Sequence, residues 1–153
     1  MPDEVGADPD EVANALDRAE MAAIARDLTL AGVDSWGVYD VAAADWLYVV
    51  GTPPPQPAWP HPTLLLVIRG DALSVQDICP TDDMSVKVLE ELQAWAMDAT
   101  RMPFPEPVVG EVLEPGRHDG ELAWTYGRRP VVRVGSLAGM RWRPRPSIPP
   151  SRD

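Results

Sequence analysis

Cysteine, phenylalanine, lysine and asparagine each occur only once in this chain of 153 residues. The single cysteine, Cys79, excludes an internal disulfide framework and gives no sign of an oxidising compartment. The chain also lacks an apolar run long enough to span a membrane. It shows no signal-peptide pattern, which would be a charged segment, then an apolar segment, then a cleavage site. We therefore expect a soluble, cytoplasmic protein without disulfides. The scarcity of Lys and Asn beside frequent Ala, Pro, Gly and Arg follows GC-rich codons, which suggests a bacterial or phage origin.

Basic residues are scarce everywhere except at the C-terminal end. The net charge is −11, but residues 1–127 hold twenty-three acidic and six basic side chains, a balance of −17, while residues 128–153 hold seven arginines and one aspartate, a balance of +6. An acidic body repels nucleic acid and anionic membranes and attracts basic partners. We therefore expect a protein partner, basic in character, and neither a membrane nor a nucleic acid. An acidic surface that only keeps the protein dissolved is the alternative.

Recognisable catalytic motifs are also missing. The chain has no G-x-S-x-G, no H-E-x-x-H and no Gly-rich phosphate loop. His118 precedes Asp119, a pair that could serve as a base and its orienting group, but no nucleophile motif accompanies it. Cys79, His61, His118 and Asp82 lack any metal-ligand spacing. We therefore predict no catalytic residue, no metal and no cofactor, and keep a small-ligand binder or enzyme only as a third hypothesis.

The stretch from residue 63 to residue 100 has the clearest pattern. Residues 63–69 form a continuous apolar run of strand length, which is typical of a strand inside a sheet. Residues 72–78 alternate between apolar and polar, as a half-buried returning strand does. Residues 81–83 offer side-chain oxygens that can cap a helix, and apolar residues at steps of three and four then predict an amphipathic helix that ends near residue 100.

A first helix is predicted near the N-terminus. Residues 8–11, Asp-Pro-Asp-Glu, supply an N-cap, a proline at the first helical position and an acid three residues after the cap. We expect this helix to run over residues 9–31, with Gly32 as its left-handed stop. Its apolar residues form two offset stripes: Val12, Leu16, Ala19, Ala23 and Leu30, and Met21, Ile24 and Leu28. Two apolar faces indicate contact with the domain on one side and, on the other, a neighbouring element or a second copy of the chain.

The remaining segments complete an α+β domain. Further strands are expected at residues 35–41, 45–50, 108–113, 121–126 and 131–134. Residues 51–62 contain six prolines and read as a stiff connector, while residues 114–116 read as a turn. We predict one mainly antiparallel sheet of five to seven strands with two helices on one face.

Two domain divisions fit this pattern. In the first, residues 1–135 form a single domain and residues 136–153 an extended, basic, proline-rich C-terminal tail. In the alternative, the chain splits near Pro103, and residues 108–135 become a small separate β unit.

A protein-binding role follows from the coil tryptophans and the charge. Trp59 lies among prolines and Trp142 among arginines. Tryptophan and arginine are both enriched at protein–protein hot spots. The residues predicted to contact a partner are Trp59, His61, Arg141, Trp142, Arg143 and Arg145. We therefore expect a non-enzymatic interaction protein, such as an inhibitor, immunity factor, chaperone or adaptor. A structural or assembly subunit of a phage or another multiprotein particle is the second hypothesis.

Overall fold

A computed structural model describes residues 16–70, 72–78 and 83–140 of the chain. Within these ranges the elements follow in the order α2 (Arg18–Thr29), β1 (Trp36–Asp40), β2 (Asp45–Val50), β3 (Leu64–Arg69), β4 (Leu73–Ile78), α3 (Met84–Thr100), β5 (Glu114–His118), β6 (Glu121–Tyr126), β7 (Arg129–Arg133) and a short 3₁₀ helix, η1 (Leu137–Gly139). The predicted α+β class with antiparallel strands is confirmed. The predicted elements at residues 35–41, 45–50, 63–69, 72–78, 84–100 and 121–126 are also present, to within a residue or so at each end.

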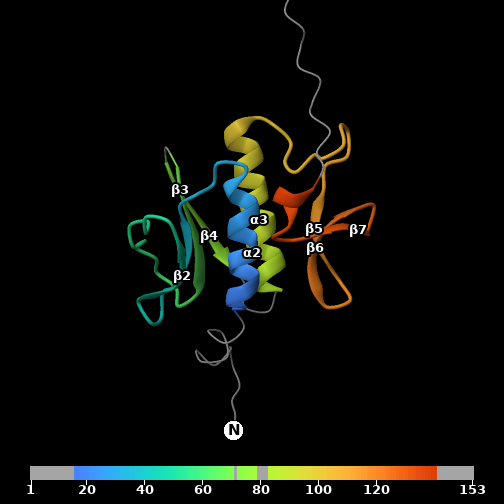
Figure 1. Cartoon of the computed structure of the whole chain (residues 1–153). Coiled ribbons are helices and arrows are strands. Elements are labelled where there is room, and N and C mark those ends of the chain that lie inside the picture. The colour runs from blue at the N-terminus through green and yellow to red at the C-terminus, as the bar shows by residue number, and fades with distance from the viewer. Residues whose placement is uncertain (1–15, 71, 79–82, 141–153) are drawn as a thin grey trace, which may run out of the picture.

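The seven strands divide over two sheets rather than one. A four-stranded sheet has the order β2-β1-β3-β4, and a three-stranded sheet has the order β5-β6-β7. Figure 1 places α2 and α3 side by side between the two sheets. Both helices thus lie on one face of the four-stranded sheet, as predicted, and the three-stranded sheet covers their other side.

Strand β3 lies in the interior of its sheet, as its apolar run predicted. It pairs with β1 on one side and with β4 on the other. Leu64, Leu66 and Ile68 face the helices and belong to the main core. Leu65 and Val67 face outward into a smaller apolar cluster. The proline-rich connector between β2 and β3 supplies part of the cover for this outer cluster.

Helix α2 begins later than predicted. Its N-cap is Asp17, whose carboxylate accepts a hydrogen bond from the Glu20 backbone N–H at 3.0 Å. Since Leu16 and Asp17 are not helical, one continuous helix over residues 9–31 is wrong. The capping pattern at residues 8–11 lies outside the described residues. The predicted stop is confirmed, because Gly32 has a φ of +83°.

The two apolar faces of α2 contact two different parts of the same chain. Met21, Ile24 and Leu28 are fully buried in the core. Ala23 lies on the other face, against Gly135, where an added Cβ would come within 2.8 Å of the alanine Cβ. A neighbouring element therefore covers the second face at this position.

The segment after α3 differs most from the prediction. Residues 108–113 hold only an isolated bridge between Val108 and Glu111 instead of a strand. The buried side chain of Gln93 fixes this segment, which has no strand ladder. Its Nε2 donates hydrogen bonds to the carbonyl oxygens of Phe104 at 2.9 Å and Leu113 at 2.6 Å. These bonds satisfy buried backbone acceptors without a neighbouring strand.

The predicted turn at residues 114–116 is wrong, because these residues begin β5. Pro115 pairs with Trp124 of β6 in an edge strand. An edge strand tolerates proline, since one of its sides has no partner that requires a backbone N–H. Beyond β7 the packing continues as far as Leu137, which is fully buried. Of the predicted tail, residues 141–153 lie outside the described residues.

Candidate interaction surface

Two consecutive tight hairpins build the three-stranded sheet. Asp119 and Gly120 join β5 to β6 with φ values of +51° and +81°, and Gly127 and Arg128 join β6 to β7 with φ values of +57° and +68°. Two-residue loops with positive φ at both positions match the twist of paired strands, and Asp-Gly is a favoured pair there. An arginine at the second position is strained by about 1 kcal/mol. The sequence therefore keeps a long cationic side chain at a tip where glycine would fit better.

Residues 126–133, which we name the basic hairpin, contain three arginines and no acidic residue. Tyr126 and Val131 are 43% and 42% exposed, which is high for large apolar side chains. Arg128 and Arg129 are exposed and form no ion pair with any described residue, whereas Arg133 pairs with Glu121. The basic hairpin thus presents two uncommitted guanidinium groups beside exposed apolar surface.

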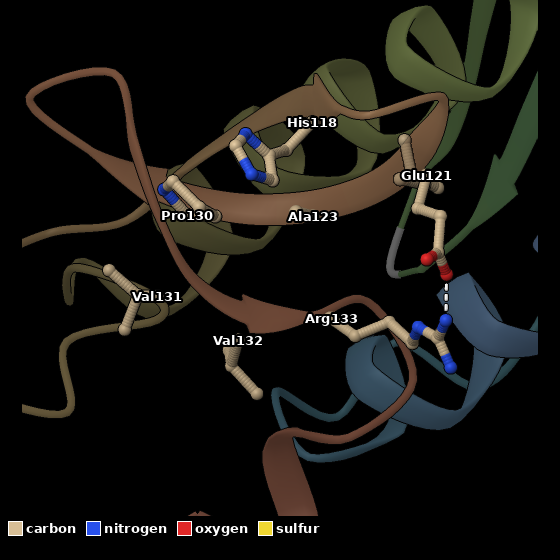
Figure 2. Close-up of a pocket in the computed structure, with 8 residues that line it drawn as sticks. His118, Glu121, Ala123, Pro130, Val131, Val132 and Arg133 are labelled. Atoms are coloured by element: carbon tan, nitrogen blue, oxygen red, sulfur yellow. Dashed lines mark hydrogen bonds and ion pairs between the residues drawn. The ribbon is translucent and has the colours of Figure 1, made fainter.

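A shallow hollow is lined by residues 130–133 of the basic hairpin together with residues of β5 and β6. Figure 2 shows Ala123 of β6 between His118 of β5 and the side chains of β7, with the Glu121–Arg133 ion pair at one end. The hollow has a volume of about 200 Å³. Pockets for small molecules usually measure about 300–1,000 Å³. The hollow is therefore of a size to receive one side chain of a partner.

A larger hollow between α3 and β5 has a different character. Its volume is about 450 Å³, and its lining is mainly polar: Glu90, Gln93, Glu114, Pro115, Gly116, Arg117, Thr125 and Arg128. Small-molecule sites are mostly apolar with a few polar groups. One of the lining residues, Arg117, already donates hydrogen bonds to Glu20 and Asp83. This lining therefore does not resemble a typical ligand pocket.

Arg117 of β5 joins the starts of both helices. It donates from Nη1 and Nη2 to the two carboxylate oxygens of Glu20 on α2, at 2.7 and 2.8 Å. It also donates from Nε and Nη2 to Asp83, the N-cap of α3. Ser85 adds a hydrogen bond from Oγ to Glu20 Oε1 at 2.6 Å. We name these four residues the Arg117 clamp.

The charges of the clamp shift the pKa values of its members. Hydrogen bonds from Arg117 lower the pKa of Glu20 and of Asp83 below their ordinary values of 4.5 and 3.8. The same bonds raise the pKa of Arg117 above its ordinary range. All three groups are therefore charged near neutral pH and committed to one another, which suits a structural role rather than proton transfer.

A second buried acid connects α2 to the end of the described chain. Asp27 is 1% exposed. Its carboxylate accepts hydrogen bonds from Trp124 Nε1 at 2.8 Å, from the Gly135 N–H at 2.6 Å and from the Leu137 N–H at 3.2 Å. A buried carboxylate with several donors is well compensated. Asp27 thus anchors β6 and η1 on α2 and is not available to a ligand.

Of the residues predicted to bind a partner, the structure describes two. Trp59 is half-buried and packs on the outer cluster that Tyr39, Leu65 and Val67 form, so it folds back onto its own domain. Its indole N–H is buried and has no hydrogen-bond partner among the described residues. His61 is exposed in the same connector. The other four, Arg141, Trp142, Arg143 and Arg145, lie outside the described residues, and their role stays a prediction.

The candidate metal ligands are not brought together. His61 belongs to the connector of the four-stranded sheet and His118 to the end of β5, on opposite sides of the helices. Cys79 and Asp82 lie outside the described residues. Within the part of the chain that is described, no group of three or more His, Cys, Asp or Glu side chains could hold a metal ion, and no helix is long and apolar enough to cross a membrane.

Comparisons of the chain with protein-family models, with curated proteins and with solved structures found no match. The functional argument therefore depends on the exposed surface and its charges.

Proposed function

We propose that the chain binds a protein partner through the basic hairpin, and that the partner presents acidic side chains to Arg128 and Arg129. The observation that carries this proposal is Arg128, an exposed arginine held at a φ of +68° without an ion pair to any described residue. Strained backbone conformations are more frequent at functional sites than elsewhere, which supports a use for this side chain. Tyrosine and arginine, both present here, are enriched at binding hot spots.

The acidic charge of the rest of the chain favours contact between an acidic partner and the basic hairpin rather than any other surface. An acidic partner meets repulsion over most of a surface with a net charge of −11, and attraction at the basic hairpin. The same repulsion acts on nucleic acid, whose phosphates extend well beyond one hairpin. A binding role of the inhibitor, immunity, chaperone or adaptor type fits such a single, oriented contact.

The test compares two arginines in the same backbone conformation. Arg128 and Arg101 are both exposed and have φ values of +68° and +58°, but only Arg128 lies in the basic hairpin. Arg128→Gly and Arg101→Gly each remove one positive charge and relieve similar strain. Affinity capture from a host extract at low salt, with each variant as bait, should lose the partner with Arg128→Gly and retain it with Arg101→Gly.

Other outcomes assign a different function. If both variants capture the partner equally well, the basic hairpin is not the binding surface. If capture improves when Arg128 is removed, the partner is basic and binds the acidic surface, as the overall charge predicts. If nuclease treatment releases everything that is captured, the partner is nucleic acid.

A further inference from the structure

The two sheets end in four edge strands, and three of these carry a feature that blocks further pairing. In β2, Leu47 is an extra residue without a partner in β1. In β5, Pro115 interrupts the strand. In β7, Pro130 and an extra residue, Val131, disturb the edge. Bulges and prolines on edge strands prevent the addition of another chain.

Strand β4 has none of these features. It pairs with β3 over six consecutive residues without a register shift, and contains no proline, lysine or arginine. On its other side no strand of the described chain is paired with it. Leu73 at its start is 44% exposed, and Gln76 and Asp77 are exposed as well. A regular, partly apolar edge whose outer backbone groups pair with no described strand is a ready template for another strand.

The charges of β4 suit pairing with itself. Its only charged side chain is Asp77, which accepts a hydrogen bond from Thr63 Oγ1 at 2.7 Å. An antiparallel pair with its two-fold axis at Val75 places Leu73 opposite Asp77 and Ser74 opposite Gln76, so that like charges do not meet. The same operation on β7 would place Arg129 opposite Arg133, and like charges directly opposite are destabilising.

The apolar surface beside β4 also adjoins the edge at which a second β4 strand would pair. Val75 packs on the outer cluster that contains Leu65 and Val67. Leu73 lies on the same face as Val75, because side chains two residues apart in a strand point to the same side. Pairing of two β4 strands would extend the outer cluster across the two-fold axis and bury Leu73 and Val75 of both copies.

We infer that two copies of the chain associate through antiparallel pairing of β4 with β4, forming one continuous eight-stranded sheet. This contact is distinct from the basic hairpin, which belongs to the other sheet. Two copies that each carry a net charge of −11 repel each other, and salt screens that repulsion over a Debye length of about 8 Å at physiological ionic strength. Dimerisation therefore strengthens with salt, whereas binding of an acidic partner to the basic hairpin weakens.

The test is sedimentation equilibrium over a range of protein and salt concentrations, with two matched variants. Leu73→Glu places a carboxylate directly opposite Asp77 of the second copy, and Val109→Glu makes the same change at another exposed apolar residue, 52% exposed, that lies outside the described strands. We expect a monomer–dimer equilibrium in the unaltered chain, a dissociation constant raised about tenfold or more by Leu73→Glu, because like charges then meet across the strands, and a much smaller change with Val109→Glu.

Two results would overturn the inference. The first is a monomer at every protein and salt concentration, which would leave the β4 edge free or reserved for a strand of another protein. The second is a dimer that Leu73→Glu does not weaken, which would place the contact elsewhere. If circular dichroism shows that Leu73→Glu is unfolded, Gln76→Lys, at an exposed position of the same strand, takes its place.

Discussion

At the scale of single residues, Arg128 and Asp27 represent opposite uses of a charged side chain. Arg128 is exposed at the tip of the basic hairpin and strained in its backbone, so its contribution to folding is unfavourable. Asp27 is buried and accepts three hydrogen bonds, so its contribution to folding is favourable as long as those three donors are in place. The effects of replacing them should therefore differ in sign.

Arg128→Gly should stabilise the fold by about 0.5–1 kcal/mol, because glycine adopts a positive φ without a steric penalty. Chemical denaturation monitored by tryptophan fluorescence measures this change. The same substitution should abolish partner capture, so that stability and binding move in opposite directions. A loss of stability together with binding would mean that Arg128 only supports the fold.

Asp27→Ala should destabilise the protein by at least about 3 kcal/mol, because three donors lose their acceptor in a buried site. Asp98→Ala, at an exposed position of α3, is the matched control and should change the free energy of unfolding by less than about 0.5 kcal/mol. Urea denaturation of both variants gives the comparison. Equal changes in the free energy of unfolding would show that the hydrogen bonds of Asp27 do not stabilise the packing of β6 on α2.

At the scale of elements, the Arg117 clamp fixes β5 to the N-terminal ends of α2 and α3. Glu20 and Asp83 have lowered pKa values in the folded protein, so the folded state resists their protonation. The stability that these two carboxylates confer is complete above their ordinary pKa values of 4.5 and 3.8, and is lost as the pH falls through the lowered values. Acid should therefore loosen the three-stranded sheet from the helices.

Arg117→Gln should lower the free energy of unfolding at pH 7 by about 1–2 kcal/mol, a modest value because the clamp is partly exposed and solvent screens it. It should also flatten the fall in stability between pH 5 and the acid range. Thermal unfolding across a pH series measures both effects, with Arg129→Gln as a control that has no ion pair to a described residue. A curve for Arg117→Gln that is parallel to that of the unaltered protein would contradict the role of the clamp.

Sequence patterns identified some elements well and others poorly, for reasons that the contacts explain. Residues 63–100 follow their apolar periodicity because each element there packs on one core. Residues 108–116 do not, because the side chain of Gln93 holds residues 108–113 and an edge position accommodates Pro115. Periodicity carries no information on either contact.

The candidate site was harder to predict than the fold. Trp59 is a predicted partner contact because tryptophan in coil is unusual, yet in the fold it packs on the outer cluster, a contact that the sequence does not reveal. The signal for the basic hairpin was present in the sequence as three arginines without an acid over residues 126–133. The positive φ of Arg128 was not predictable, because it depends on the exact register of β6 and β7.

At the scale of the whole molecule, the position of the helices between two sheets makes each sheet depend on the other. A chain that ends at residue 107 lacks Arg117 and Trp124, and leaves the second face of α2 uncovered. Such a chain should show no cooperative thermal transition by circular dichroism, whereas a chain that ends at residue 140 should retain one. A sharp transition in the shorter chain would instead support a separate β unit after Pro103.

The bond between Asp27 and Trp124 also has a consequence for synthesis of the chain. Its two ends are 97 residues apart. At translation rates of about 5–20 residues per second, the carboxylate waits roughly 5–20 s for its indole partner after leaving the ribosome. During that interval only the four-stranded sheet and α3, among the described elements, can cover α2, and the face that later meets Gly135 stays exposed. We therefore expect the nascent chain to expose apolar surface that a chaperone could bind until its last hairpin has emerged.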